Sequence, residues 1–477
     1  MKQLQFYISK IDSNLLKSIG GRPGELIHLL KTNQFLSEEA LAEQLFSGNW
    51  SRQNYLNLKQ RTRRILEAFF LVNPTKKGNE VLGKMQRCRK LYHLSMSLIE
   101  QAKRGDAKKM LEEGYNIARV YGFTQLGYNC SLELMIDASL RGKKSRYELY
   151  REQKNSLLHD LQSESLVQDF YYQIALRVNK KRGVIEEYFF NEMMTELDRH
   201  HCTTTRYVQF YYMIVIFYNL NTRDYKAVKK SSQLALEILR NRKGVYRSVL
   251  QFFAKNKALG HLAHREYSVC RKLLLEAEQY SENHSFNLGI LHYYQALNEL
   301  HSEEYNRAYE LYRIHRKTKY EVLREQWKVM GAYLYFLKKV GRLSTGVDRF
   351  SVGKYLNETA KSSSDKTGNN INILIGELLI YLVKNKGKFI DRIESINQYS
   401  YYHLKNSDTQ RARWFIRILC TLPRANFSAA GMERLASRQI DNLFKYPISV
   451  GDNLSIEIIP FEKLIELIWE RLKEKVA

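Results

Sequence analysis

The stretch LHYYQALNELHSEEYNRAYELY, residues 291–312, has the spacing of two helices joined by a short turn. Tyr305 begins the second helix directly after the turn. Tyr267 stands at the same kind of junction 38 residues before it, and Tyr225 stands 42 residues before Tyr267. Intervals of about 40 residues are typical of stacked two-helix units. The stretch therefore predicts a helical-repeat array in this part of the chain.

Alanines recur at fixed distances from these tyrosines. Ala235 and Ala277 follow the first two tyrosines by ten residues, and Ala258 and Ala296 precede the last two by nine. Small side chains at these places would let the paired helices approach each other closely, while the tyrosine seals the turn. We expect all four alanines to lie between packed helices.

The pattern over residues 203–320 resembles tetratricopeptide repeats. It departs from them in three ways, because Ile216 replaces a small residue, His315 replaces an alanine, and the usual terminal proline is missing. The resemblance implies a divergent array of antiparallel helical hairpins.

Proline usage extends this prediction to most of the chain. Only five prolines occur in 477 residues, and none lies between Pro74 and Pro423. Proline breaks helix interiors, so a long proline-free span favours serially packed helices. Residues 207–218 (YVQFYYMIVIFY) are apolar on nearly every face and require cover on both sides. We predict an all-α fold, an α-solenoid of antiparallel helical hairpins with a small N-terminal helical cap.

The chain is expected to have three parts. Residues 1–80 form an N-terminal helical unit, residues 81–345 the tetratricopeptide-like array, and residues 346–477 a C-terminal helical extension and cap. In the N-terminal unit, Arg22-Pro23-Gly24 opens one helix, Ser37 caps a second, and a basic third helix starts near Ser51. Three such helices describe either a DNA-reading unit or a plain cap. The cap is favoured because no short turn with a recognition-helix signature separates the last two.

Two C-terminal stretches carry a second resemblance. FIDRIESINQYSYYHLKNSDTQRARWFIRIL and IEIIPFEKLIELIWERL, within residues 389–472, are similar to a family of uncharacterised helical-repeat proteins of about this length from Bacteroidetes bacteria. The N-terminal unit with its basic helix also resembles theirs in arrangement. The resemblance implies an all-helical, cytoplasmic protein and brings no catalytic residues with it.

Motifs for catalysis or cofactors are lacking in the sequence. It has no Walker A loop, no G-x-G-x-x-G, no G-x-S-x-G and no H-E-x-x-H. The start lacks a signal-peptide pattern, and the most apolar runs are too short to span a bilayer. The run His200-His201-Cys202 and the pair His261 and His264 are weak metal candidates, since a closed site needs about four ligands. We expect no enzyme, no cofactor, no metal and no membrane span, and we expect five reduced, mostly buried cysteines.

Charge is the strongest compositional signal. Lys and Arg number 76 against 50 Asp and Glu, a formal net charge of +26, which favours anionic partners. The basic clusters that could bind an anion or a partner are Lys59, Arg61, Arg63, Arg64, Lys84, Arg87, Arg89, Lys90, Lys226, Lys229, Lys230, Arg313, Arg316 and Lys317.

Two functions follow from these clusters, with a solvated basic exterior as the plain alternative. The first is a non-enzymatic scaffold that binds a protein or peptide, acidic in character, on a surface such as the concave face of the array. The second is a regulator that contacts RNA or DNA phosphates through basic helix faces.

Overall fold

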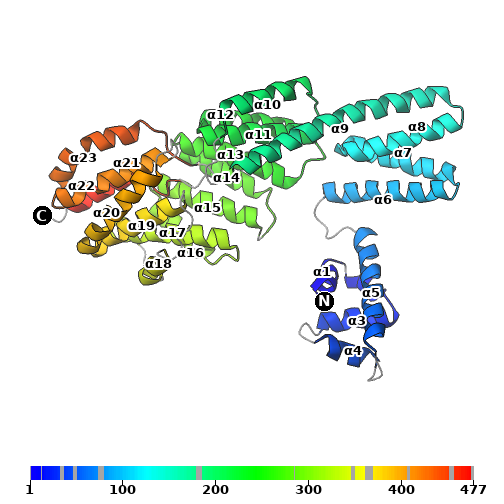
Figure 1. Cartoon of the computed structure of the whole chain (residues 1–477), viewed down its shortest axis with the longest axis horizontal. Coiled ribbons are helices and arrows are strands. Elements are labelled where there is room, and N and C mark those ends of the chain that lie inside the picture. The colour runs from blue at the N-terminus through cyan, green and yellow to red at the C-terminus, as the bar shows by residue number, and fades with distance from the viewer. Residues whose placement is uncertain are drawn as a thin grey trace. The chain divides into compact units, whose positions relative to one another are not determined.

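The structure is a computed structural model that describes residues 2–11, 13–32, 37–46, 51–72, 80–178, 185–283, 285–344, 350–359, 369–404, 409–450 and 456–473. Helices α1 to α24 make up its secondary structure, and no strand occurs in these residues. The predicted all-α class is confirmed. Helices that follow each other in sequence pack against each other, as in an α-solenoid (Figure 1). The antiparallel arrangement of neighbours stays a prediction.

The chain divides into two compact units, Met1–Gln162 and Ser163–Ala477. The division falls inside the long helix α9 (Lys144–Val178). We call the two parts unit 1 and unit 2 and describe each by itself. The predicted domain boundaries near residues 80 and 345 stay predictions.

Two hydrophobic clusters occur among the described residues of unit 1. The helices of this unit before α9 are α1 (Lys2–Lys10), α2 (Ser13–Lys17), α3 (Gly21–Thr32), α4 (Glu38–Phe46), α5 (Arg52–Val72), α6 (Glu80–Glu100), α7 (Arg104–Tyr121) and α8 (Thr124–Leu140). Leu26 of α3, Leu41 of α4 and Leu66 of α5 meet in the first cluster. Leu111 of α7 and Leu134 of α8 meet in the second. The expected cap at Ser37 is present, because its hydroxyl accepts a hydrogen bond from the first turn of α4. Ser51, near which the third helix was expected to start, accepts one from the first turn of α5.

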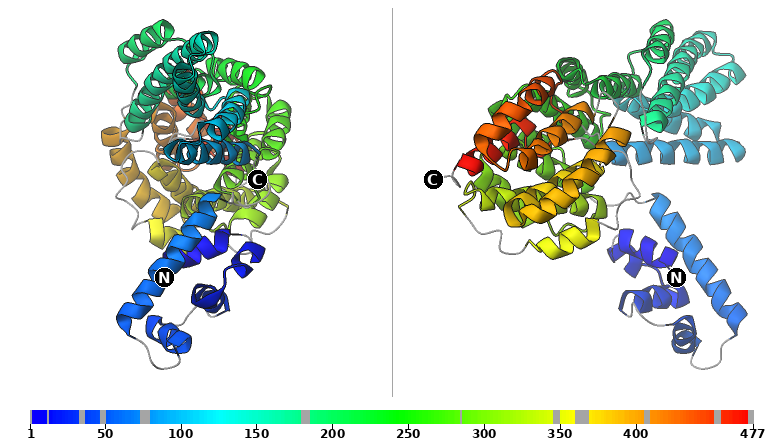
Figure 2. Two further views of the ribbon diagram at one scale, coloured as in Figure 1. Left: turned by 90° about the vertical axis from the view of Figure 1, so that its right-hand side faces the viewer. Right: turned by 60° about the vertical axis from the view of Figure 1, so that its left-hand side comes forward.

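Unit 2 has one continuous hydrophobic core, which extends from Val167 to Leu472. Its helices after α9 are α10 (Glu187–Arg199), α11 (Thr205–Thr222), α12 (Tyr225–Leu239), α13 (Arg247–Ala263), α14 (Tyr267–Glu278), α15 (Phe286–His301), α16 (Tyr305–His315), α17 (Glu321–Lys339), α18 (Val352–Thr359), α19 (Asn369–Lys384), α20 (Lys386–His403), α21 (Gln410–Leu419), α22 (Thr421–Arg424), α23 (Ala429–Phe444) and α24 (Phe461–Lys473). Figure 2 shows α24 in red among the green and orange helices of this unit.

The predicted junctions before Tyr225, Tyr267 and Tyr305 have one common backbone geometry. These tyrosines are the first residues of α12, α14 and α16. Two residues before each tyrosine the chain adopts a left-handed conformation, with φ values of 61°, 61° and 64°. In each junction the amide before the tyrosine donates to a carbonyl five residues back, which closes the preceding helix. The array therefore repeats in structure as well as in sequence.

The four alanines predicted to lie between helices are confirmed as buried. Ala235, Ala258, Ala277 and Ala296 are each 0% exposed. The close approach is visible beside them at Gly260 of α13, where a Cβ would stand 2.8 Å from the Cβ of Lys229 on α12. Small residues at these positions set the spacing of the array.

Burial separates two kinds of helix in the repeat region. The helices α13, α15 and α17 are buried on nearly all sides along their C-terminal halves, and we call them the inner helices. The helices α12, α14 and α16 bury one face and expose the other, and we call them the outer helices.

The first helices, α1 and α2, were not identified from the sequence, because their short apolar patterns lack clear start signals. Helix α9 continues without a break from Lys144 to Val178, and α21 ends at Leu419 before the short helix α22.

Candidate functional site

The chain after α23 turns back into the interior of unit 2. Residues 445–450 and 456–473, which we call the closing segment, contact one element after another. The Val450 amide donates to the hydroxyl of Tyr225 on α12 at 3.1 Å. The side-chain amide of Asn372 on α19 donates to the Ile456 carbonyl at 2.7 Å. His301 at the end of α15 bonds the Glu457 carbonyl at 2.7 Å. Side chains of the array thus satisfy backbone groups of a buried, non-helical stretch, as buried polar groups require.

A buried ionic cluster holds the same stretch from the other side. The guanidinium of Arg411 on α21 donates to both oxygens of Glu457 and, at 2.5 Å, to Glu462. These three side chains are 6%, 1% and 8% exposed. Glu457 also accepts from the Phe461 amide at 3.0 Å, which caps α24. We call Arg411, Glu457 and Glu462 the ionic clasp.

The clasp connects α21 and the closing segment to the junction after α13. Arg265, which follows α13, forms an ion pair with Glu462. Burial raises the pKa of Glu457, and the adjacent Arg411 opposes that rise. The two carboxylates share one buried guanidinium, so removal of Arg411 would leave both without their principal partner. Such a cluster is expensive to break although its formation contributes little net stability.

His301 gives the clasp a dependence on pH. Burial lowers the pKa of His301 to about 4; Arg265 and Arg411 lower it further, whereas the Glu457 carbonyl and Glu462 oppose the shift. Its ordinary value is 6.5, so the unfolded chain takes up the proton first. The stability that is linked to neutral His301 is therefore fully present above pH 6.5, and it is lost as the pH falls toward 4.

We expect His301→Gln to remove this part of the pH dependence. Between pH 7.5 and pH 5, the wild-type free energy of unfolding should fall by about 2 kcal/mol more than that of the variant. Urea unfolding of both proteins at the two pH values measures the difference. Equal falls would show that His301 ionises normally in the folded protein.

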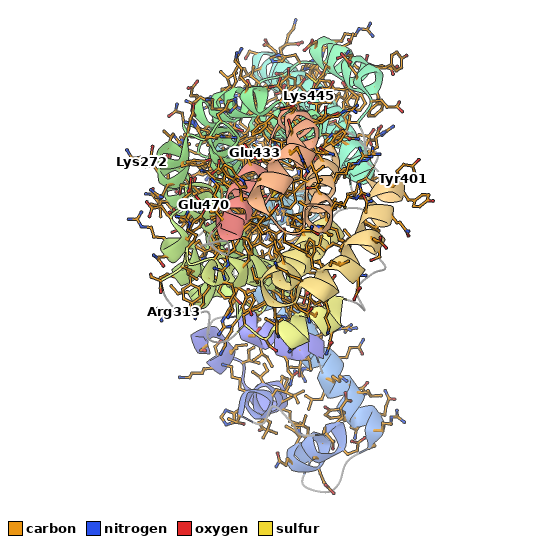
Figure 3. The ribbon with its side chains drawn as sticks, turned by 90° about the vertical axis from the view of Figure 1, so that its left-hand side faces the viewer. Lys272, Arg313, Tyr401, Glu433, Lys445 and Glu470 are labelled. Atoms are coloured by element: carbon orange, nitrogen blue, oxygen red, sulfur yellow. The ribbon has the colours of Figure 1, made fainter. Side chains whose placement is uncertain are left out.

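The closing segment also ties the junctions of the array together at the surface. Lys463 on α24 pairs with Glu303 in the junction before α16 at 2.8 Å, and Arg342, which follows α17, pairs with Glu470. Figure 3 shows Glu470 on the same side of this end of unit 2 as Lys272 and Arg313, with Tyr401 on the other side. These exposed pairs orient α24 and contribute little to stability.

Burial of the inner helices changes where a partner could bind. The segment from Tyr293 to His301 on α15 is buried throughout, and so is most of Met330–Leu337 on α17. The sequence analysis named the concave face of the array as an example of a binding surface. On these halves of the inner helices, such a surface is not exposed. A partner must contact other faces.

Seven of the predicted basic residues have contacts within their own unit. Five of them form ion pairs within their own unit, at distances between 2.6 and 3.4 Å. These are Lys59 with Glu38, Arg63 with Glu67, Arg87 with Glu113, Lys229 with Glu266 and Arg313 with Glu310. Arg316 lies over the ring of Tyr312, and Lys84 lies over that of Tyr121. Whether any of them contacts a partner stays a prediction.

Lys84 and the seven remaining residues are exposed and form no ion pair with the described residues. They are Arg61 and Arg64 on α5, Lys84, Arg89 and Lys90 on α6, Lys226 and Lys230 on α12, and Lys317 after α16. Within unit 2 the structure places Lys226 and Lys230 one helical turn apart on the exposed face of α12.

Apolar side chains that the sequence analysis missed lie exposed on the same outer helices. Leu234 on α12, Leu275 on α14 and Ile314 on α16 are 38%, 53% and 63% exposed. Lys272 on α14 and Arg313 on α16 accompany them, and Figure 3 shows both pointing away from the ribbon on one side of the molecule. We call the exposed sides of α12, α14 and α16 the outer face. Helical periodicity could have revealed it, because these apolar residues stand outside the buried stripe.

Histidines considered as metal ligands have other contacts. His261 pairs with Glu266, and His264 bonds the Gly260 carbonyl at 2.6 Å. Within the described ranges, no group of three or more His, Cys, Asp or Glu side chains is placed to hold a metal ion. The five cysteines are free thiols, and four of them are buried. Among the residues that the structure describes, no helix is both long and apolar enough to cross a membrane.

Comparison with known proteins adds no relative. No protein-family model, no curated protein and no solved structure matches the chain.

Proposed function

We propose that the protein is a non-enzymatic helical-repeat scaffold that binds an acidic protein or peptide on the outer face of unit 2. The observation that carries the proposal is the contrast between the two sides of the array. The C-terminal halves of the inner helices are buried, whereas the outer helices expose lysine and arginine beside leucine and isoleucine.

The outer face has the composition of a peptide-binding surface. Lys226, Lys230 and Lys272 supply positive charge without a carboxylate partner among the described residues. Leu275 and Ile314 supply apolar area that no other part of the described chain covers. Charge complementarity steers an acidic partner to the face, and apolar contacts slow its release. Because successive outer helices repeat the pattern, the face suits an extended segment.

A labelled peptide of alternating glutamate and leucine tests the proposal by fluorescence anisotropy. The triple variant Lys226→Gln, Lys230→Gln, Lys272→Gln should bind about ten-fold more weakly, because each exposed charge contributes a few tenths of a kcal/mol to about 1 kcal/mol. Leu275→Ser with Ile314→Ser should weaken binding and leave its salt dependence unchanged.

The matched control removes two positive charges from α20 and one from the residue that follows α23. Lys386→Gln, Lys388→Gln and Lys445→Gln alter exposed residues outside the outer face. An equal loss in this control would mean that net charge alone attracts the peptide, and the proposal would fail. It would also fail if natively purified protein carried nuclease-sensitive material that excludes the peptide from the outer face.

A further inference from the structure

A second basic surface lies on α21 and α22, and none of its residues belongs to the clusters predicted from the sequence. Arg413 and Arg417 lie one helical turn apart on α21, and Arg424 at the end of α22 acts electrostatically on Cys420 together with Arg417. None of the three forms an ion pair with the described residues. Glu394 on α20 also acts electrostatically on Cys420, but its carboxylate pairs with none of these arginines.

The arginines on α21 are held together without a counter-anion. Burial lowers the pKa of Arg417, and the neighbouring charge of Arg413 lowers it further. The Nε atom of Arg413 and the Nε1 atom of Trp414 are both shielded from solvent and lack an acceptor in the described structure. An anionic ligand bound beside the two guanidinium groups would relieve the repulsion between Arg413 and Arg417.

Aromatic rings accompany the arginines. The guanidinium of Arg417 lies 4.7 Å from the ring centre of Trp414. Tyr401 and Tyr402, at the end of α20, are 56% and 66% exposed and meet edge to face with centroids 5.3 Å apart. Tyr401 is close enough to Arg417 to oppose the lowering of the Arg417 pKa, and Figure 3 shows the ring of Tyr401 pointing away from the ribbon into solvent.

We propose that this surface binds a single-stranded nucleic acid, with Arg413, Arg417 and Arg424 on its phosphates and Tyr401 stacked on a base. Arginine beside exposed aromatic rings is the combination that sequence-tolerant single-strand binding uses. An acidic peptide could occupy the arginines, but it would not provide flat groups for the two tyrosine rings. The surface is separate from the outer face, so it would give the scaffold a second kind of partner.

The test is anisotropy of a fluorescein-labelled oligouridylate of about twelve nucleotides with the full chain, titrated at several salt concentrations. Arg417→Gln with Arg424→Gln should reduce the slope of log K against log salt by about 1.4, because each lost phosphate contact accounts for about 0.7 in a single strand. Tyr401→Ala should weaken binding about ten-fold and leave the slope unchanged. Arg413 is left intact because its shielded Nε could affect folding.

Lys272→Gln is the matched control, since it removes one positive charge from the outer face of the same unit. It should leave oligouridylate binding unchanged and weaken binding of the acidic peptide. The two proposals can therefore fail separately. Circular dichroism should show native helix content in every variant. The proposal would be overturned if the wild-type protein did not bind the oligouridylate at low salt. It would also be overturned if the Arg417→Gln, Arg424→Gln variant and the Tyr401→Ala variant bound it as tightly as the wild type. The surface would be assigned to an acidic protein instead if the glutamate–leucine peptide displaced the oligouridylate and the same variants weakened binding of that peptide.

Discussion

A chain that ends at Phe444 is expected to lose the cooperative fold of unit 2. The truncation removes Ile458, Ile459, Phe461, Leu464 and Ile468, which are each 0–3% exposed in the core. Burial of five such side chains contributes roughly 8–15 kcal/mol, which is as large as the net stability of a typical domain. Their removal also exposes the inner helices to solvent. Circular dichroism, thermal unfolding and dye binding should reveal a helical protein without a sharp transition.

The control is a chain that ends at Lys473, which keeps every contact of the closing segment. It should unfold at the same temperature as the full-length protein. If the chain ending at Phe444 unfolded as sharply as this control, the closing segment would be an accessory and the interior of unit 2 would be stable without it.

Arg411→Met is expected to destabilise unit 2 by about 3–5 kcal/mol. Methionine fills a similar volume, so packing is largely retained. The loss arises because Glu457, at 1% exposed, and Glu462, at 8%, remain buried without their guanidinium. Urea unfolding at pH 7.5 measures the change.

A triple variant separates charge from packing at this place. Arg411→Met combined with Glu457→Gln and Glu462→Gln should recover much of the lost stability, because no unpaired charge stays buried. Lys463→Met, which breaks two exposed pairs on α24, should cost less than about 1 kcal/mol. If Arg411→Met cost no more than Lys463→Met, the clasp would be solvated in solution.

The sequence predicts the repeat region well because its signals are local. Tyr225, Tyr267 and Tyr305 mark junctions that the structure confirms, and the buried alanines follow from the same spacing. Helix starts at Ser37 and Ser51 are likewise set by side chains within three residues of the amides that they cap. Such features depend on short-range chemistry and can be recognised from neighbouring residues.

The closing segment could be recognised only as a terminal amphipathic helix. Arg411 and Glu457 are 46 residues apart, and Tyr225 and Val450 are 225 apart. No local pattern records such pairings, so nothing in the sequence indicated that Arg411 is buried. Conversely, counts of lysine and arginine could not separate paired residues such as Arg87 from exposed ones such as Arg89. The basic clusters were therefore chosen where Lys and Arg residues are most frequent in the sequence, and the arginines of α21 were not among them.

Hydrogen–deuterium exchange of the full-length protein tests the central claim, that the chain's own C-terminus closes the interior of unit 2. The amides of Val450, Glu457 and Phe461 donate to buried acceptors, so peptides that contain them should exchange as slowly as those of α13 and α15. Exchange within seconds in these peptides, while α13 and α15 stay protected, would contradict the account. The interior would then be open, and the inner helices would become available to a partner.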